Sequence, residues 1–213
     1  MKRAAAVLLL ALAACSRGEA PAPRPAAAAT GPVALFVGDS LTAGYGVDPE
    51  DAWPRLVGDS WEKRGLNWRA RDAAVSGATS AGVAGEVAWA LTPDVKLVFI
   101  CVGGNDGLRG VPPPETERNL RALIAGLQKR GLRVALAGMK IPPNYGAERA
   151  RDFAAVFPAV ARERRVPFLP FLLEGVAADP ALNQEDGLHP NVEGHKRVAA
   201  SVEAFLDKED LLK

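Results

Sequence analysis

Short runs of apolar residues alternate with longer segments of helical period, and this alternation restricts the fold more than any other feature of the chain. Strands are predicted at residues 33–37, 68–75, 95–102, 133–137 and 166–169. Helices are predicted at residues 53–63, 80–90, 114–130, 148–163 and 192–206. Because the strands are almost continuously apolar, both faces of their sheet should be covered. The sequence therefore predicts an α/β fold with a doubly wound, mostly five-stranded parallel sheet of flavodoxin-like type.

Two of these strands carry further local information. The strand at 166–169 is short and contains a proline, which favours the edge of the sheet. Cys101 lies within the apolar strand at 95–102, where a free cysteine packs as a small hydrophobic residue. The folded domain is therefore expected to need no disulfide.

The first 31 residues are predicted to lie outside the fold. Residues 1–14 form a basic start and a short apolar run, as in a lipoprotein signal peptide, and Cys15 follows at the position of a lipidated cysteine. An ordinary secretory signal next to a cysteine is the alternative. Residues 15–31 hold that cysteine and an Ala/Pro-rich tether, so the domain is expected to span 32–213. Ser16 favours the periplasmic face of the outer membrane as the place of this lipid anchor.

Composition limits the partners of the domain. The chain has 213 residues, of which 48% are apolar, and a net charge of +1. One well-packed domain is expected, without the basic field that nucleic acid requires. Only two histidines are present, His189 and His195, and no Cys, His and carboxylate residues cluster at zinc-ligand spacing. We expect no metal and no cofactor, a monomer, and His195 as an ordinary residue that is on a helix surface or partly buried.

Glycines mark the ends of three predicted strands, at Gly38, Gly103 and Gly138. Open α/β sheets bind their ligands at the carboxyl ends of the strands. The segments that carry Ser40 and Asn105 follow the first and third strands, so both should emerge at the same edge of the sheet.

Ser40, Asp186 and His189 together have the residue types of a nucleophile, an orienting acid and a base. Serine attacks efficiently only when a neutral imidazole takes its proton, and a carboxylate can hold that imidazole in place. Taken singly, each has a plainer interpretation. Ser40 suits a helix N-cap, the nearby glycines suit a phosphate cradle only weakly, and residues 186–190 suit a surface turn.

Gly77 and Asn105 are candidates for stabilising an oxyanion. Acyl transfer places negative charge on the former carbonyl oxygen, and fixed N–H donors lower that barrier. A backbone N–H of Gly77, the Asn105 amide and the N–H of Ser40 would supply three donors. The alternatives are a turn glycine at Gly77 and an ordinary loop after a strand at Asn105.

These segments, taken together, resemble the SGNH (GDSL) hydrolase family. The matching blocks, in the order of the family, are Gly-Asp-Ser-Leu at 38–41, Gly77, Gly-Gly-Asn-Asp at 103–106 and Asp-Gly-Leu-His at 186–189. Segments 38–46, 103–110 and 142–146 are similar to the arylesterase/thioesterase I/lysophospholipase group within it.

The resemblance implies a three-layer α/β/α fold and hydrolysis of esters or thioesters without a cofactor. It makes Ser40 the nucleophile, His189 the base and Asp186 the orienting acid. It also places the Ser40 N–H, the Gly77 N–H and the Asn105 side chain in the oxyanion hole. One departure is Ala78, where close relatives often carry an acidic residue, so a chain-length preference does not carry over from the family.

We therefore expect a lipid-anchored serine esterase that acts on acyl or aryl esters through an acyl-serine intermediate. Lysophospholipids are accessible substrates at that location, and thioesters are expected to be cleaved in vitro. Leu108, Val111, Ile141 and the neighbouring prolines are predicted walls of an acyl groove. One alternative is a carbohydrate or peptidoglycan O-acetylesterase, which shares the catalytic blocks. The other is a non-catalytic, flavodoxin-like binding lipoprotein.

Overall fold

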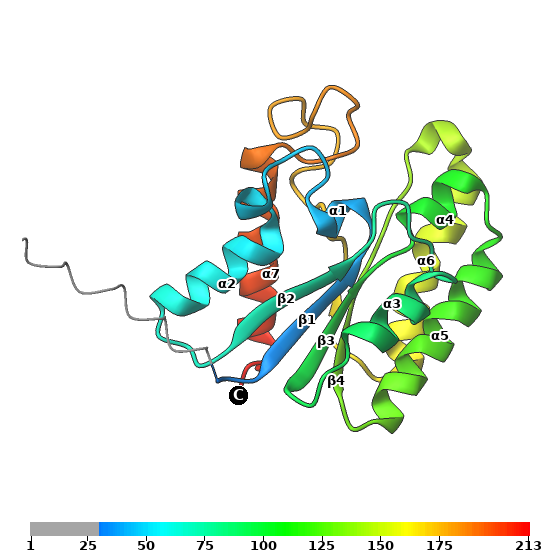
Figure 1. Ribbon diagram of the computed structural model, residues 1–213. Helices are drawn as coiled ribbons and strands as arrows, with labels where there is room; N and C mark the ends of the chain where they lie inside the picture. Colours follow the sequence, from blue (N-terminus) through cyan, green and yellow to red (C-terminus); the bar gives the residue numbers. More distant parts are fainter. Residues whose placement is uncertain (1–29) are drawn as a thin grey trace, which may run out of the picture.

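The computed structural model describes residues 30–213, which form one sheet with helices on both faces (Figure 1). The signal peptide expected at 1–14, the lipidated Cys15 and almost all of the tether expected at 15–31 lie outside the described residues. Among the helices of residues 30–213, none combines the length and the apolar composition that crossing a bilayer requires.

All strands of the sheet are parallel, and their order is β2-β1-β3-β4-β5. Their bounds are β1 Val33–Gly38, β2 Arg69–Ala74, β3 Val95–Cys101, β4 Arg133–Ala137 and β5 Phe168–Leu169. Strands β1 and β2 pair in register from Val33 with Arg69 to Gly38 with Ala74, so the two strands end at the same level. This order confirms the predicted fold class, with β5 as a two-residue strand at the edge.

The helices lie in two layers, one on each face of the sheet (Figure 1). Their bounds are α1 Ser40–Ala43, α2 Trp53–Lys63, α3 Val83–Ala90, α4 Gly104–Arg109, α5 Pro113–Lys129, α6 Ala147–Arg164 and α7 Val192–Lys208, with 3₁₀ turns η1 Pro49–Asp51 and η2 Pro143–Tyr145. Helices α2 and α7 pack together on one face, and α5 packs against α6 on the other. The helix expected to begin at residue 80 begins three residues later, because Ser80 is bonded to a side chain of α4.

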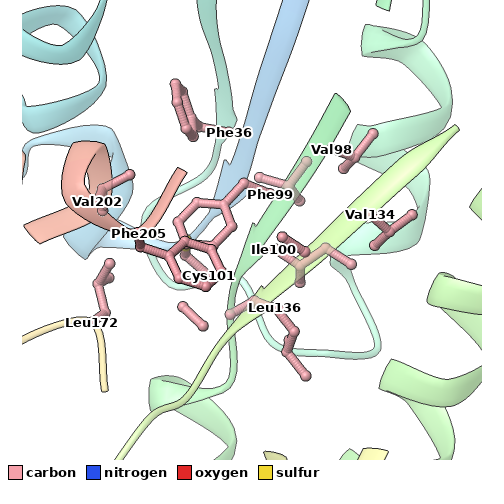
Figure 2. Close-up of a cluster of buried hydrophobic side chains, with 14 of the residues drawn as sticks. Phe36, Val98, Phe99, Ile100, Cys101, Val134, Leu136, Leu172, Val202 and Phe205 are labelled. Carbon is pink, nitrogen blue, oxygen red and sulfur yellow. The ribbon is translucent and has the colours of Figure 1, made fainter. Parts of the chain in front are cut away.

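Aromatic side chains fill the space between the sheet and the α2–α7 layer (Figure 2). Phe99 on β3 lies with its ring centroid 5.6 Å from that of Phe205 on α7 and 6.1 Å from that of Phe36 on β1. Cys101 is fully buried at the end of β3, which confirms the prediction that it belongs to the core. Burial raises the pKa of its thiol well above the usual value, so the thiolate needed for reaction is disfavoured.

Candidate active site

Ser40 stands at the start of α1, two residues after β1 ends at Gly38. The residue between them, Asp39, is extended and accepts the N–H of Leu41 at 3.1 Å, so the N-cap of this short helix is Asp39 and not Ser40. Gly38 is required by a close approach: a Cβ there would meet the hydroxyl of Thr42 and lie 2.8 Å from a backbone oxygen of β3. The tight packing of Gly38 between α1 and β3 therefore sets the direction in which Ser40 emerges.

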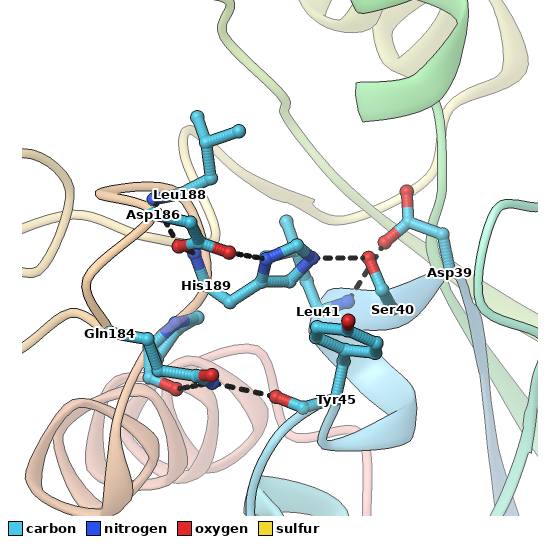
Figure 3. A network of polar contacts seen from close by, with 9 residues as sticks. Asp39, Ser40, Leu41, Tyr45, Gln184, Asp186, Leu188 and His189 are labelled. Carbon is cyan, nitrogen blue, oxygen red and sulfur yellow. Dashed lines mark hydrogen bonds and ion pairs between the residues drawn. The ribbon is translucent and has the colours of Figure 1, made fainter.

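Asp186 and His189 lie in the loop before α7 and reach back to Ser40 (Figure 3). Nδ1 of His189 is 2.6 Å from Oδ2 of Asp186, and Nε2 of the same ring is 2.9 Å from Oγ of Ser40. A carboxylate only accepts, so Nδ1 carries the ring proton when Asp186 is ionised. Nε2 is then the acceptor that faces the serine hydroxyl.

The carboxylate of Asp186 also organises its own loop. Its Oδ1 accepts the backbone N–H groups of Leu188 at 2.9 Å and His189 at 3.0 Å. Desolvation acts to raise the pKa of Asp186, but the hydrogen bonds from the backbone and ring of His189 and from Leu188 outweigh it and lower the pKa to about 2. The carboxylate that faces the imidazole is therefore ionised from moderately acidic to alkaline pH.

Two residues that the sequence analysis did not assign hold His189 in place. The rings of Tyr45 and His189 lie with their centroids 4.7 Å apart. The amide of Gln184 donates to the backbone oxygen of Tyr45 at 2.7 Å and to that of Pro190 at 2.9 Å, which joins the two loops (Figure 3). Tyr45 belongs to the GDSL-like segment 38–46, whereas no local pattern points to Gln184.

Asp39 is a third unassigned residue next to Ser40. Its side chain is 1% exposed, and within residues 30–213 its Oδ2 has no hydrogen-bond partner. Desolvation raises the pKa of Asp39 from 3.8 to about 6, against the opposing effects of the Leu41 N–H and His189. A buried carboxyl therefore titrates close to the serine.

Gly77 and Asn105 lie at the same edge of the sheet as Ser40, beyond the carboxyl ends of the strands. Gly77 is in the loop after β2, and Asn105 is in α4. Gly77 has a φ of +84°, which favours glycine. One N–H of the Asn105 amide donates to the backbone oxygen of Ala78 at 3.0 Å, which leaves the second N–H of that amide available. Ser40, Gly77, Asn105 and His189 all line one cleft of about 390 Å³.

The walls of this cleft are mostly apolar. They include Leu41, Tyr45, Leu108, Pro142, Leu173 and Leu188, with Lys140 among them. Leu108 was expected there, but Val111 and Ile141 do not line the cleft. Ile141 is 5% exposed, and its side chain lies where a Cβ on Gly107 would fall, so it packs beneath α4 instead.

His195 was expected on a helix surface or partly buried, and that expectation is wrong. It is 1% exposed on α7, where Nδ1 accepts the backbone N–H of Trp53 at 3.3 Å. The packing of α7 against α2 closes water off from the ring. Within residues 30–213, no three His, Cys, Asp or Glu side chains gather at metal-binding distance.

Comparison with known proteins gives related sequences over the same part of the chain. The model of the GDSL-like Lipase/Acylhydrolase family matches residues 36–197. The chain is 36% identical over 169 residues to Esterase TesA of Pseudomonas aeruginosa, which covers 79% of this chain and 84% of the relative. It is also 36% identical over 173 residues to Thioesterase 1/protease 1/lysophospholipase L1 of Escherichia coli, covering 81% and 82% respectively.

A solved structure shows the same fold. The psychrotrophic esterase EstA from Pseudoalteromonas, in a form inhibited by monoethylphosphonate, superposes with a TM-score of 0.79 at 30% identity. The match covers 83% of this chain and 97% of that one.

Proposed function

We propose roles for three residues from the premise that this chain belongs to the GDSL-like lipase/acylhydrolase family and is an ester hydrolase. Ser40 is its nucleophile, His189 its base and Asp186 its orienting acid. The observation that carries this assignment is the continuous hydrogen-bonded path from Oγ of Ser40 through the His189 ring to Asp186. The path joins residues that are 149 positions apart in the sequence. Arrangements of this kind are recognised by geometry and roles.

In the proposed reaction, Nε2 of His189 takes the hydroxyl proton as Oγ of Ser40 attacks the ester carbonyl. The carbonyl π electrons move to the oxygen, and the resulting oxyanion accepts hydrogen bonds from the N–H groups of Ser40 and Gly77 and from the Asn105 amide. Collapse expels the alcohol, which receives the proton from His189, and leaves an acyl-serine. Water, activated by the same imidazole, then releases the acid.

The lining and the volume of the cleft support a proposal for the substrate class. Leucines and a proline surround a volume of about 390 Å³. This apolar lining suits an acyl or aryl group, and the volume exceeds what an acetyl group fills. The names of the relatives, an esterase and a thioesterase/lysophospholipase, support the same class. We therefore propose acyl and aryl esters as substrates, including lysophospholipids, with thioesters cleaved in vitro.

The location is proposed from the sequence and from the bacterial relatives. Residues 1–14 act as a signal peptide, Cys15 carries the lipid, and residues 15–31 tether a monomeric domain of residues 32–213 to the periplasmic face of the outer membrane. Labelling of the wild-type chain by a radioactive fatty acid in growing cells, lost in Cys15→Ala, supports the anchor. Equal labelling of both forms would refute it.

The test of the reaction is hydrolysis of p-nitrophenyl esters from acetyl to palmitoyl by wild type, Ser40→Ala and Ser201→Ala. Ser201, on α7, controls for the substitution itself. Ser40→Ala should lose at least about 10⁴-fold in kcat, while Ser201→Ala keeps wild-type rates and the longer esters react best. A sharp preference for acetyl would indicate an O-acetylesterase. Full activity in Ser40→Ala would refute the assignment, and no turnover by folded wild type would indicate a binding protein.

A further inference from the structure

The loop between β2 and α3 carries Gly77 but has little apolar anchoring. Val75 is 42% exposed, Ser76 is exposed, and Gly77 to Thr79 are half-buried. Ser80, at 2% exposed, is the buried residue of this stretch, and it is polar. Hydrophobic packing therefore does not determine the position of the loop, and specific hydrogen bonds must do so.

The carboxylate of Asp106 provides the main hydrogen bonds to this loop. Asp106 is fully buried in α4, directly after Asn105. Its Oδ2 accepts the backbone N–H of Ser80 at 2.8 Å, and its Oδ1 accepts the hydroxyls of Ser80 at 2.5 Å and of Thr116 at 3.2 Å. Asn119 in turn donates to the Ser80 hydroxyl at 3.0 Å. Within residues 30–213, no Lys, Arg or His pairs with this carboxylate.

These bonds hold Gly77 from its C-terminal side. On its N-terminal side, the N–H of Val75 donates to the backbone oxygen of Gly38 at 3.1 Å, which fixes the loop to the strand that precedes Ser40. On its C-terminal side, the amide of Asn105 donates to the backbone oxygen of Ala78, and the carboxylate of Asp106 accepts the N–H of Ser80. The three proposed oxyanion donors are thus connected through one set of hydrogen bonds.

We infer that Asp106 is a positioning residue that, through Ser80, sets the Gly77 N–H against the oxyanion formed at Ser40. The inference rests on the proposed function of these residues. Hydrogen bonds to a buried carboxylate are strong and directional. An oxyanion donor is effective only at about 2.7–3.1 Å from the developing charge, and loss of one donor costs about 100- to 1000-fold in kcat. Displacement of the loop should therefore lower kcat and leave KM nearly unchanged.

The two hydroxyls that donate to the same oxygen of Asp106 provide a matched experiment. Ser80 lies on the loop and Thr116 on α5, so Ser80→Ala and Thr116→Val each remove one hydroxyl bond to Oδ1. Full-length wild type and both variants are compared for kcat, KM and thermal unfolding. We expect similar losses of stability, a kcat about tenfold or more lower in Ser80→Ala, and wild-type kcat within about twofold in Thr116→Val. Asn119→Ala removes the hydrogen bond that Asn119 donates to the Ser80 hydroxyl, and it measures how much of the Ser80→Ala effect comes from that bond.

Asp106→Asn tests the carboxylate itself, because an amide has one acceptor oxygen and cannot accept both the Ser80 N–H on one side and the two hydroxyls on the other. Its kcat should fall by about 100-fold, and the inhibition constant of an alkylboronic acid, which forms a tetrahedral adduct, should rise in proportion. If Asp106→Asn does not fold, Ser80→Ala decides.

Unchanged kcat in folded Ser80→Ala, or an equal loss of kcat in Thr116→Val, would overturn the inference. Full activity in Ser40→Ala would instead show that the proposed function had failed.

Discussion

Asp39→Asn should stabilise the protein at pH 8 and have little effect at pH 4. The carboxyl of Asp39 is 1% exposed and its Oδ2 has no hydrogen-bond partner within residues 30–213. Burial raises the pKa of Asp39 from 3.8 to about 6, so the folded state disfavours the ionised form. An asparagine keeps the acceptor for the Leu41 N–H and removes the buried charge, since Asn and Asp are comparable N-caps.

The magnitude follows from the linkage between proton binding and folding. A change in pKa from 3.8 to about 6 corresponds to roughly 3 kcal/mol at about 1.4 kcal/mol per tenfold change in affinity. This cost applies fully well above pH 6, where Asp39 is ionised in both folded and unfolded chains. It is largely absent by pH 4, because the folded form is then protonated. After an unpaired amide N–H is allowed for, we expect Asp39→Asn to gain roughly 1–2 kcal/mol at pH 8.

Urea unfolding at pH 8 and pH 4 measures this difference directly. Asp72→Asn, at an exposed position on β2, is the matched control and should change stability by no more than about 0.5 kcal/mol at either pH. An equal effect of Asp39→Asn at both pH values, or a loss of stability at pH 8, would show that desolvation of Asp39 is not the dominant effect.

Two further substitutions test burial elsewhere in the fold. Burial lowers the pKa of His195 from 6.5 to about 4, so the neutral ring stabilises the fold above pH 6.5, and this contribution is lost as the pH falls to 4. His195→Asn, which retains an acceptor for Trp53, should flatten that dependence in urea titrations, and an unchanged slope would contradict it. Gly103→Ala should cost about 2 kcal/mol or more in thermal unfolding, because φ is +127° and a Cβ would lie 2.9 Å from Phe157. Gly126→Ala, in an open position on α5, should instead gain about 0.5–1 kcal/mol, and equal effects would refute the argument.

The sequence by itself determined the elements of the fold and the residue types of the site. The apolar run at 33–37 predicts β1 and the helical pattern at 53–63 predicts α2, because side-chain periodicity depends only on neighbours along the chain. The wall residues of the cleft were harder to predict. Leu108, on α4, lines it, whereas Ile141 packs beneath α4 and does not reach it. The packing of that helix on the rest of the fold decides which of these side chains faces the cleft.

Only the tertiary structure decided how individual polar groups are solvated and paired. From the sequence, no role was assigned to Asp39, His195 or Asp106, yet each is at most 1% exposed in the fold. Their neighbours come from distant segments: Trp53 is 142 positions from His195, and Ser80 is 26 from Asp106. Desolvation and hydrogen-bond geometry depend on such neighbours, and a local pattern carries no information about them. For this reason the sequence indicated which residues are candidates for the reaction, and the packing of α1, α4 and the β2–α3 loop decided how they are held.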